Sequence, residues 1–287
     1  MKARRMAKIC TGQDGAIWGD YFFRFKSNGE CWVYELPRIM QGGGEAVEAF
    51  STFCLDRTDL LMPHSNAVSF GCEYAEDGDE FPLLYTNIYN SYAKAEDKKE
   101  GVCCVYRLQR SGNQFRTQLV QVVRVGFAGS LGLWRSETGK DVRPYGNFVV
   151  DRERKIYYGF TMRDEEQTTR YFSFRLPRST EGLWDERLAA RCVTLTETDV
   201  IGYFDCPYHR YVQGACVHEG KIYSLEGFAD DAKNPPALRV IDPAELRQLS
   251  YLPMKEVGLS EEPEWIDIYD GRCFYADHAG KVYQILF

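Results

Sequence analysis

The same arrangement of polar and apolar positions recurs five times along the chain. It is clearest at residues 213–226 (QGACVHEGKIYSLE), where a small polar group leads a run of β-forming residues, a glycine turn follows, and a second run has an aromatic side chain near its centre. Short apolar or alternating runs bounded by Gly, Asn and Asp are typical of β-strands joined by tight turns. The repeat therefore predicts a β-hairpin at five places in the chain.

Further strand-like runs extend each hairpin. The five copies begin near residues 13, 64, 145, 213 and 262, and a third run follows the hairpin in each copy. A fourth run lies between the copies, at 47–55, 117–126, 191–197 and 250–259. Four strands per unit, repeated at intervals of about 50 to 80 residues, are typical of β-propeller blades with loop insertions. We therefore expect an all-β, five-bladed propeller of four-stranded blades that forms a single domain over residues 1–287.

The two ends of the chain complement each other. The fifth unit has only three runs before the chain ends, whereas residues 6–12 (MAKICTG) form a strand-like run ahead of the first unit. We expect this N-terminal strand to become the outer strand of the fifth blade, because closing the ring removes an open sheet edge. Residues 180–190 (TEGLWDERLAA) are expected to form a helical turn.

Composition narrows the class of protein. Aromatic residues make up 14% of the chain, with 19 Tyr and 17 Phe, which favours strands over helices. The net charge of −7 argues against nucleic-acid partners, because phosphate binding needs a basic surface. No window reaches the roughly 18 apolar residues of a membrane span, and the first residues lack the apolar stretch of a signal peptide. The ten cysteines include no CxxC pair, so we expect buried free thiols, a cytoplasmic location and no zinc ribbon.

Polar residues lead the five repeats. In a propeller the innermost strands line a central channel, so their first residues surround its mouth although they are scattered in the sequence. Amide, imidazole, phenol and carboxylate groups can hydrogen-bond sugar hydroxyls or another small polar ligand. The residues expected to contact the ligand are Gln13, His64, Asn66, Tyr145, Asn147, Gln213 and Glu262. In the alternative interpretation, these side chains only hold channel water and satisfy backbone groups.

With these strands in place, the chain resembles five-bladed β-propellers over nearly its whole length. Propellers of this kind include tachylectin-type lectins and glycoside hydrolases of the arabinanase group. Residues 13–25 (QDGAIWGDYFFRF) are similar to the first blade of the arabinanase-like hydrolases, which implies that Asp14 is a general base. Those enzymes also use a carboxylate from a middle blade, but the third and fourth repeats here begin with Asn147 and Gln213, which cannot ionise.

The predicted propeller and the polar residues at its channel mouth lead to three functional hypotheses. The leading one is binding of a glycan or other small polar ligand at the channel mouth. The second is glycoside hydrolysis, which needs two carboxyl groups about 5 to 10 Å apart; Asp14 and Glu264 are the candidates, because the fifth blade adjoins the first in a closed ring. The third is an interaction scaffold that binds another protein.

No cofactor or metal ion is expected from the sequence. His209 follows Cys206 at a spacing that could suit a metal, but no second pair of ligands lies nearby in the sequence. His218 and His278 each precede a glycine, and we expect both in exposed turns. The acidic loop at 76–80 (EDGDE) lacks the spaced oxygen ligands of a calcium-binding loop.

Overall fold

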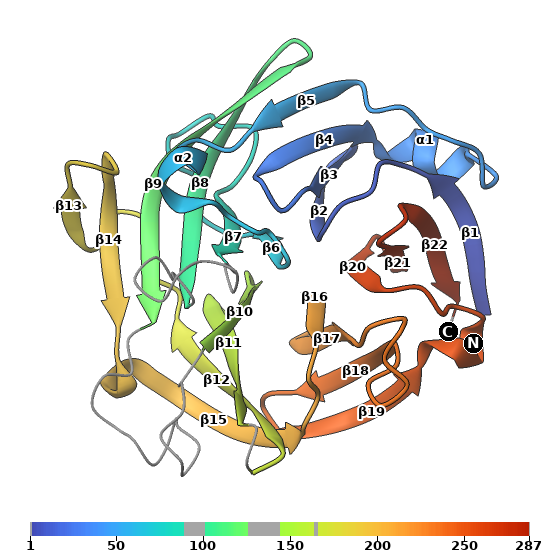
Figure 1. Ribbon diagram of the computed structural model, residues 1–287. Coiled ribbons are helices and arrows are strands. Elements are labelled where there is room, and N and C mark those ends of the chain that lie inside the picture. Colours follow the sequence, from blue (N-terminus) through green and yellow to red (C-terminus); the bar gives the residue numbers. More distant parts are fainter. Residues whose placement is uncertain (1, 89–100, 126–143, 164–165, 287) are drawn as a thin grey trace.

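The computed structural model describes residues 2–88, 101–125, 144–163 and 166–286, and its strands form five sheets arranged in a ring (Figure 1). This arrangement confirms the predicted all-β, five-bladed propeller. No helix in the described ranges has both the length and the apolar character needed to cross a membrane.

Each blade is numbered by its place in the chain and is given from the inner strand outwards. Blade 1 consists of β2 (Gly15–Trp18), β3 (Tyr21–Phe25), β4 (Glu30–Glu35) and β5 (Ser51–Cys54). Blade 2 consists of β6 (Val68–Phe70), β7 (Leu84–Ile88), β8 (Val102–Ser111) and β9 (Gln114–Val125), with two further strands described below. Blade 3 consists of β10 (Pro144–Asp151), β11 (Ile156–Arg163), β12 (Thr168–Arg175) and β15 (Val200–Pro207).

The last two blades complete the ring. Blade 4 consists of β16 (Val212–His218), β17 (Lys221–Glu226), β18 (Ala237–Asp242) and β19 (Arg247–Pro253). Blade 5 consists of β20 (Pro263–Tyr269), β21 (Arg272–Asp277), β22 (Lys281–Leu286) and β1 (Lys2–Lys8). The short helices are α1 (Leu36–Gln41), α2 (Thr58–Leu61), η2 (Glu197–Asp199) and η3 (Met254–Val257).

The N-terminal strand closes the ring, as predicted. β1 pairs antiparallel with β22, from Lys2 opposite Leu286 to Lys8 opposite Lys281, and the two ends of the chain lie side by side (Figure 1). The strand begins four residues before the predicted run, at Lys2. Only its last part is apolar enough to be recognised from the sequence, because three of its first four residues, Lys2, Arg4 and Arg5, are basic.

The prediction for the outer strand of blade 3 was wrong. Residues 190–195 form β14 (Ala190–Leu195), which pairs in parallel with β9 of blade 2, whereas β15 takes the place beside β12. The predicted helical turn at 180–190 was also wrong, because residues 183–185 form β13 (Leu183–Asp185), which pairs with β14. β14 lies along the outer edge of β9 because Val193 and Leu195 pack there with Val123 and Val125.

One apolar cluster lies between each pair of neighbouring blades. Among the described residues, the five clusters join blade 1 to blade 2, 2 to 3, 3 to 4, 4 to 5, and 5 back to 1. In the closing interface Phe22 of blade 1 stacks on Trp265 of blade 5, with ring centroids 4.1 Å apart. Face-to-face packing of this kind buries the apolar faces of neighbouring blades against one another, so each blade is stabilised by its two neighbours.

A buried ion pair lies in the outer part of blade 4. Glu226 accepts two hydrogen bonds from Arg239, from Nε at 2.6 Å and from Nη2 at 2.9 Å, and Arg239 Nη1 donates to Gln248 Oε1 at 2.7 Å. The buried His209 imidazole lies 4.0 Å from the same carboxylate. Burial, followed by the charge of Arg239, lowers the pKa of His209 from 6.5 to about 4. His209 is therefore a neutral core residue at pH 7.

Removal of residues 1–8 tests the closure of the ring. The truncated chain should lose roughly 3 kcal/mol or more of unfolding free energy, because it loses the buried Met6 and Ala7 side chains and the ladder along β22. Urea denaturation measures the effect. Arg4→Ala, which removes only an exposed hydrogen bond to Gln284, is the control and should unfold near the wild-type midpoint. Equal midpoints for the truncated and intact chains would contradict the closing role of β1.

His209 makes stability depend on pH. Its pKa is about 4 in the folded chain and near its usual 6.5 when unfolded, so between these values the unfolded state binds more protons and stability falls as the pH is lowered. The contribution of this group is a loss of about 2 kcal/mol between pH 7 and pH 5. His209→Gln, which cannot be protonated, should show a shallower decline over that range in urea denaturation series. Parallel pH profiles for the two proteins would show that His209 is not the responsible group.

Candidate functional site

The polar residues that lead the inner strands meet at one end of the central channel, which we call the leading mouth. Residues 13–14 precede β2, residues 64–66 precede β6, Gln213 lies near the start of β16, and residues 262–264 begin β20. β21 runs antiparallel to β20, so its far end returns to the same place: Pro263 pairs with Asp277, and the His278 amide donates to the Glu262 carbonyl at 2.8 Å. The leading mouth therefore also receives His278.

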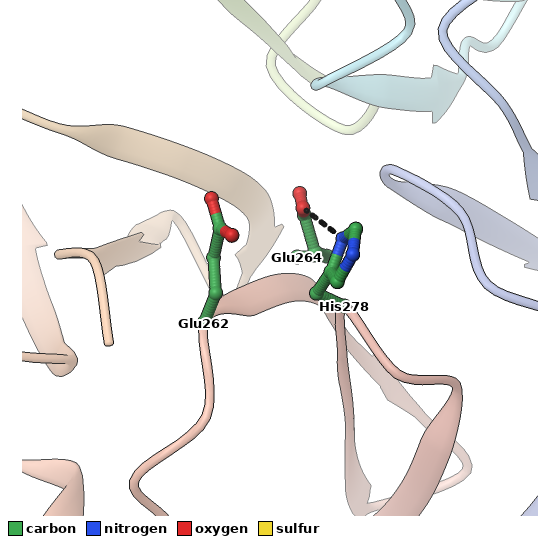
Figure 2. A group of neighbouring side chains, drawn as sticks. All are labelled: Glu262, Glu264 and His278. Carbon is green, nitrogen blue, oxygen red and sulfur yellow. Dashed lines mark ion pairs between the residues drawn. The ribbon is translucent and has the colours of Figure 1, made fainter. Parts of the chain in front are cut away.

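Two carboxylates and an imidazole form the centre of the leading mouth (Figure 2). His278 Nδ1 lies 3.6 Å from Glu264 Oε1, and one ligand atom from each of Glu262, Glu264 and His278 lies within 4.8 Å of the other two. Within the described ranges, this is the one group of three or more Asp, Glu, His or Cys side chains that meets this spacing. These three residues are the ones that could hold a metal ion.

Amide side chains from two other blades orient the carboxylates. Gln213 of blade 4 donates from Nε2 to Glu262 Oε1 at 3.0 Å. Gln13 of blade 1 donates from Nε2 to Glu264 Oε1 at 3.3 Å, and its Oε1 lies 3.0 Å from His64 Nε2 at the start of blade 2. Hydrogen bonds thus join blades 1, 2 and 5 through Gln13 and blades 4 and 5 through Gln213, and the two groups meet where Glu262 lies near Glu264 and His278.

The charges in this cluster perturb one another. Burial, and then the neighbouring Glu264 carboxylate, raises the pKa of Glu262 to about 7. Burial also raises the pKa of Glu264, against the opposing effects of His278 and Arg24. The pKa of His278 is raised by its contact with Glu264. The leading mouth is therefore acidic, and a positive charge or a hydrogen-bond donor placed there would stabilise the Glu262 and Glu264 carboxylates.

Arg24 lies behind the cluster as a buried cation. Its Nη2 donates to the carbonyl oxygens of Gly12 at 2.7 Å and Asp277 at 3.1 Å. Because these contacts join the chain before β2 to the end of β21, Arg24 helps to fix blades 1 and 5 together beneath Glu264.

Asp14 lies in the wall of the channel. Its residue is 0% exposed, and its Oδ2 accepts a 2.8 Å hydrogen bond from the Val68 amide of blade 2. A Cβ at Gly214 would lie 2.9 Å from Asp14 Oδ1 and 2.4 Å from the Glu264 carbonyl oxygen, so only glycine allows β16 to approach this closely. The general-base role of Asp14 stays a prediction, and the contacts give it a role in joining blades 1 and 2.

The remaining predicted residues differ in what they contact. The Asn66 side chain accepts a hydrogen bond from Asn87 Nδ2 at 2.5 Å, and Asn87 Oδ1 in turn accepts from the Ala67 amide at 3.0 Å. Asn66 therefore belongs to a local network of blade 2. The backbone of Tyr145 and Asn147 lies in β10 of blade 3, and their side chains lie outside the described part of the chain.

Sequence reasoning missed His278, Asn87 and Arg24. His278 was expected in an exposed turn, and its side chain is indeed 60% exposed, but it also reaches Glu264. The register of the fifth hairpin contained the usable signal, because the residue that follows the second strand returns to the first residues of the inner strand. Arg24 and Asn87 lie within apolar strands and gave no such signal.

A second hollow occupies the opposite end of the channel. This cavity of about 80 Å³ is lined by residues of all five inner strands. Its charged and titratable lining residues include Asp151, Arg152, His218 and Asp267. Asp267 Oδ2 accepts from the Ile17 amide at 3.0 Å, and burial raises the pKa of Asp267 to about 6. None of the residues predicted to contact a ligand lines this cavity.

Comparison with known proteins supports the fold and assigns no family. No family model and no curated protein matches the chain. The solved structure of Myxococcus xanthus glutaminyl cyclase superposes with a TM-score of 0.52 at 12% identity, covering 100% of this chain and 94% of that chain. Weaker likenesses include a chain of a nidogen/laminin complex, at a TM-score of 0.39 and 12% identity over 95% of this chain and 72% of that one. The Dos1 propeller superposes with a TM-score of 0.36 at 12% identity, covering 95% of this chain and 57% of that chain.

Substitutions of Asp14 test its part in the channel wall. Asp14→Ala leaves the buried Val68 amide without an acceptor and should lower the unfolding free energy by about 1–3 kcal/mol. Asp14→Asn keeps an acceptor oxygen and should lower it less. Urea denaturation of the two variants beside the wild type provides the measurement. If Asp14→Ala unfolds at the wild-type midpoint, the contact with blade 2 does not stabilise the ring.

Proposed function

We propose that this chain binds a small polar ligand at the leading mouth of its central channel. One observation carries the proposal: two hydrogen-bonded groups of side chains, His64–Gln13–Glu264 and Gln213–Glu262, bring four blades together there, and Gln13, His64, Gln213 and Glu262 remain partly exposed. Ligand sites in proteins commonly combine a concave position with a few convergent polar groups. The leading mouth supplies the convergent polar groups.

The composition of the mouth indicates the chemistry of the ligand. Carboxylates only accept hydrogen bonds when ionised, whereas amides both donate and accept. A ligand with several hydroxyl groups, or with an ammonium group, satisfies Glu262 and the exposed faces of Gln13 and Gln213 together. Glycans and other polyols are therefore the first class to examine, and amino sugars combine both kinds of donor.

Recognition is favoured over glycoside hydrolysis at this site. Hydrolysis through Asp14 and Glu264 requires both carboxyl groups to approach the scissile bond. Asp14 is 0% and Glu264 is 2% exposed, so only Glu262 offers a carboxyl group from this cluster directly to a ligand. The hydrolase hypothesis is therefore the weaker of the two.

The cytoplasmic location predicted from the sequence is part of the proposal. Reduced thiols, such as those of the ten cysteines, are typical of proteins in that compartment.

A second candidate is a reaction at an N-terminal glutamine. One solved structure that aligns with this chain over 94% of its own length, at a TM-score of 0.52, is a glutaminyl cyclase, although a shared fold alone is an analogy. The specific observation in its favour is the partly exposed Glu262 carboxylate at the mouth, which suits an α-ammonium group. In such a reaction the ammonium first loses a proton to a base, and the amine nitrogen then attacks the side-chain amide carbon. The bond from that carbon to the amide nitrogen breaks as the lactam ring closes, and ammonia leaves with a proton from the amine.

A ligand panel with two matched histidine variants tests the proposal. Isothermal calorimetry would compare neutral oligosaccharides, amino sugars and peptides that begin with glutamine, and ammonia release would be followed for the peptides. A ligand that binds the wild type should bind His64→Ala and Gln213→Ala at least tenfold more weakly, which corresponds to about 1.4 kcal/mol. His218→Ala, at the opposite end of the channel, should bind as the wild type does.

Two outcomes would contradict the proposal. One is an absence of binding for every ligand class in the panel. The other is binding that His218→Ala weakens and His64→Ala does not, which would move the site to the opposite cavity. Circular dichroism and melting curves of each variant without ligand separate a loss of binding from a loss of folding.

A further inference from the structure

We propose that Glu262, Glu264 and His278 form a binding site for a divalent transition-metal ion. One ligand atom from each residue lies within 4.8 Å of the other two, and their side chains come together at the leading mouth (Figure 2). The inference deepens the proposed function and rests on it for its role, because the ion would lie at the mouth where the ligand is proposed to bind. Metal binding itself is measured without any ligand.

All three residues come from one β-hairpin. Glu262 directly precedes β20, Glu264 is the second residue of that strand, and the His278 amide donates to the Glu262 carbonyl at 2.8 Å from the end of β21. The pairing of β20 with β21 shifts register between Pro263 and Trp265, which places Glu264 at a β-bulge. Bulges re-aim side chains, and here the local backbone brings the three ligands to one place before any ion arrives.

Glu264 supplies an independent indication of a missing partner. The residue is 2% exposed, and its Oε2 is buried with no hydrogen-bond partner among the described residues. The other oxygen, Oε1, accepts from Gln13 and contacts His278. A buried carboxylate oxygen without a partner is costly, and a cation between Glu264 and Glu262 would satisfy it.

The surroundings resemble the outer shell of a metal centre. Gln213 donates to Glu262 Oε1 and Gln13 donates to Glu264 Oε1, so an amide fixes the orientation of each carboxylate. Hydrogen bonds of this kind to ligating carboxylates tune metal affinity, and their loss typically weakens it by about 10- to 100-fold. The buried Arg24 guanidinium lies near Glu264 and opposes a second cation, so metal binding depends on the Glu262 and Glu264 carboxylates being ionised together.

The donor set selects the class of ion. Imidazole suits zinc, copper, iron and nickel, whereas carboxylate oxygens suit magnesium, calcium and manganese. One nitrogen and two carboxylates together favour Zn²⁺ or Mn²⁺ over Ca²⁺, which takes six to eight oxygen ligands. Three protein ligands leave coordination positions for water or for the polar ligand.

Calorimetry with the metal alone tests the site. The full chain, stripped with a chelator and exchanged into buffer, would be titrated with Zn²⁺, Mn²⁺ and Ca²⁺ separately. We expect one equivalent of Zn²⁺ and of Mn²⁺ to bind, and Ca²⁺ to bind at least tenfold more weakly. His278→Ala should weaken Mn²⁺ binding at least tenfold, and Glu262→Gln should do the same. His278 is largely exposed, so its replacement leaves the fold intact.

A matched control and a spectroscopic readout complete the test. Glu261→Gln removes a neighbouring carboxylate that pairs with Lys281 outside the cluster, and it should bind Mn²⁺ as the wild type does. Mn²⁺ also avoids the exposed Cys54 thiol, which prefers softer ions. Electron spin-echo modulation from an imidazole nitrogen should appear with Mn²⁺ on the wild type and disappear in His278→Ala.

The inference fails if no ion binds with one-to-one stoichiometry. It also fails if Mn²⁺ binds equally well to the wild type, His278→Ala and Glu262→Gln. Failure of the metal site leaves the ligand panel unaffected, because that panel depends on His64 and Gln213. Conversely, if the metal binds but no sugar or peptide in the panel binds, the metal site is supported and the proposal of a small polar ligand fails.

Discussion

The structure depends on the packing of each blade against its two neighbours around a closed circle. Five apolar clusters, one at each interface between described blades, bury the faces that single four-stranded sheets would expose to water. The circle is completed by a strand from the opposite end of the sequence, because β1 covers the free edge of β22. The stacked rings of Phe22 and Trp265 lie at this last interface, between the first and the fifth blade. The ring is therefore stabilised as a whole.

The same packing creates the polar centre of the molecule. Five inner strands converge on one axis, and the residues at their ends face a channel where there is little room for large apolar groups. Asp14, ahead of the inner strand of blade 1, and Arg24, in the second strand of that blade, join blades through buried hydrogen bonds. Gln13 meets Glu264 and Gln213 meets Glu262 across blades, which gives the leading mouth its acidic, hydrogen-bonding character. Neighbouring leading residues such as Gln13 and Asp14 therefore differ in exposure, since Gln13 is partly exposed and Asp14 is buried.

Strand pairing at the rim shows where local pattern stops being informative. The sequence indicated a strand at 191–197 for the outer edge of blade 3, but a second strand, β15, follows it at Val200–Pro207. β14 pairs with the outer edge of the long β9 of blade 2, where Val123 and Val125 form an apolar surface. β15 therefore takes the place beside β12 in blade 3. A sequence pattern specifies the strand but not its partner, since pairing partners compete through contacts that are distant in the chain.

Hydrophobic periodicity and turn residues, which act over a few positions, are enough to predict the architecture: the repeated hairpins, the four strands per unit and the complementary ends of the chain. The sequence also predicted Gln13, His64, Gln213 and Glu262 at one mouth, because the leading residues of inner strands must converge. Which of these side chains touch one another depends on the tertiary structure. The contact of His278 with Glu264, the burial of Asp14 and the unpartnered Glu264 oxygen depend on the distance between blades and on rotamers. Those quantities are set by packing around the whole ring, and no single repeat encodes them.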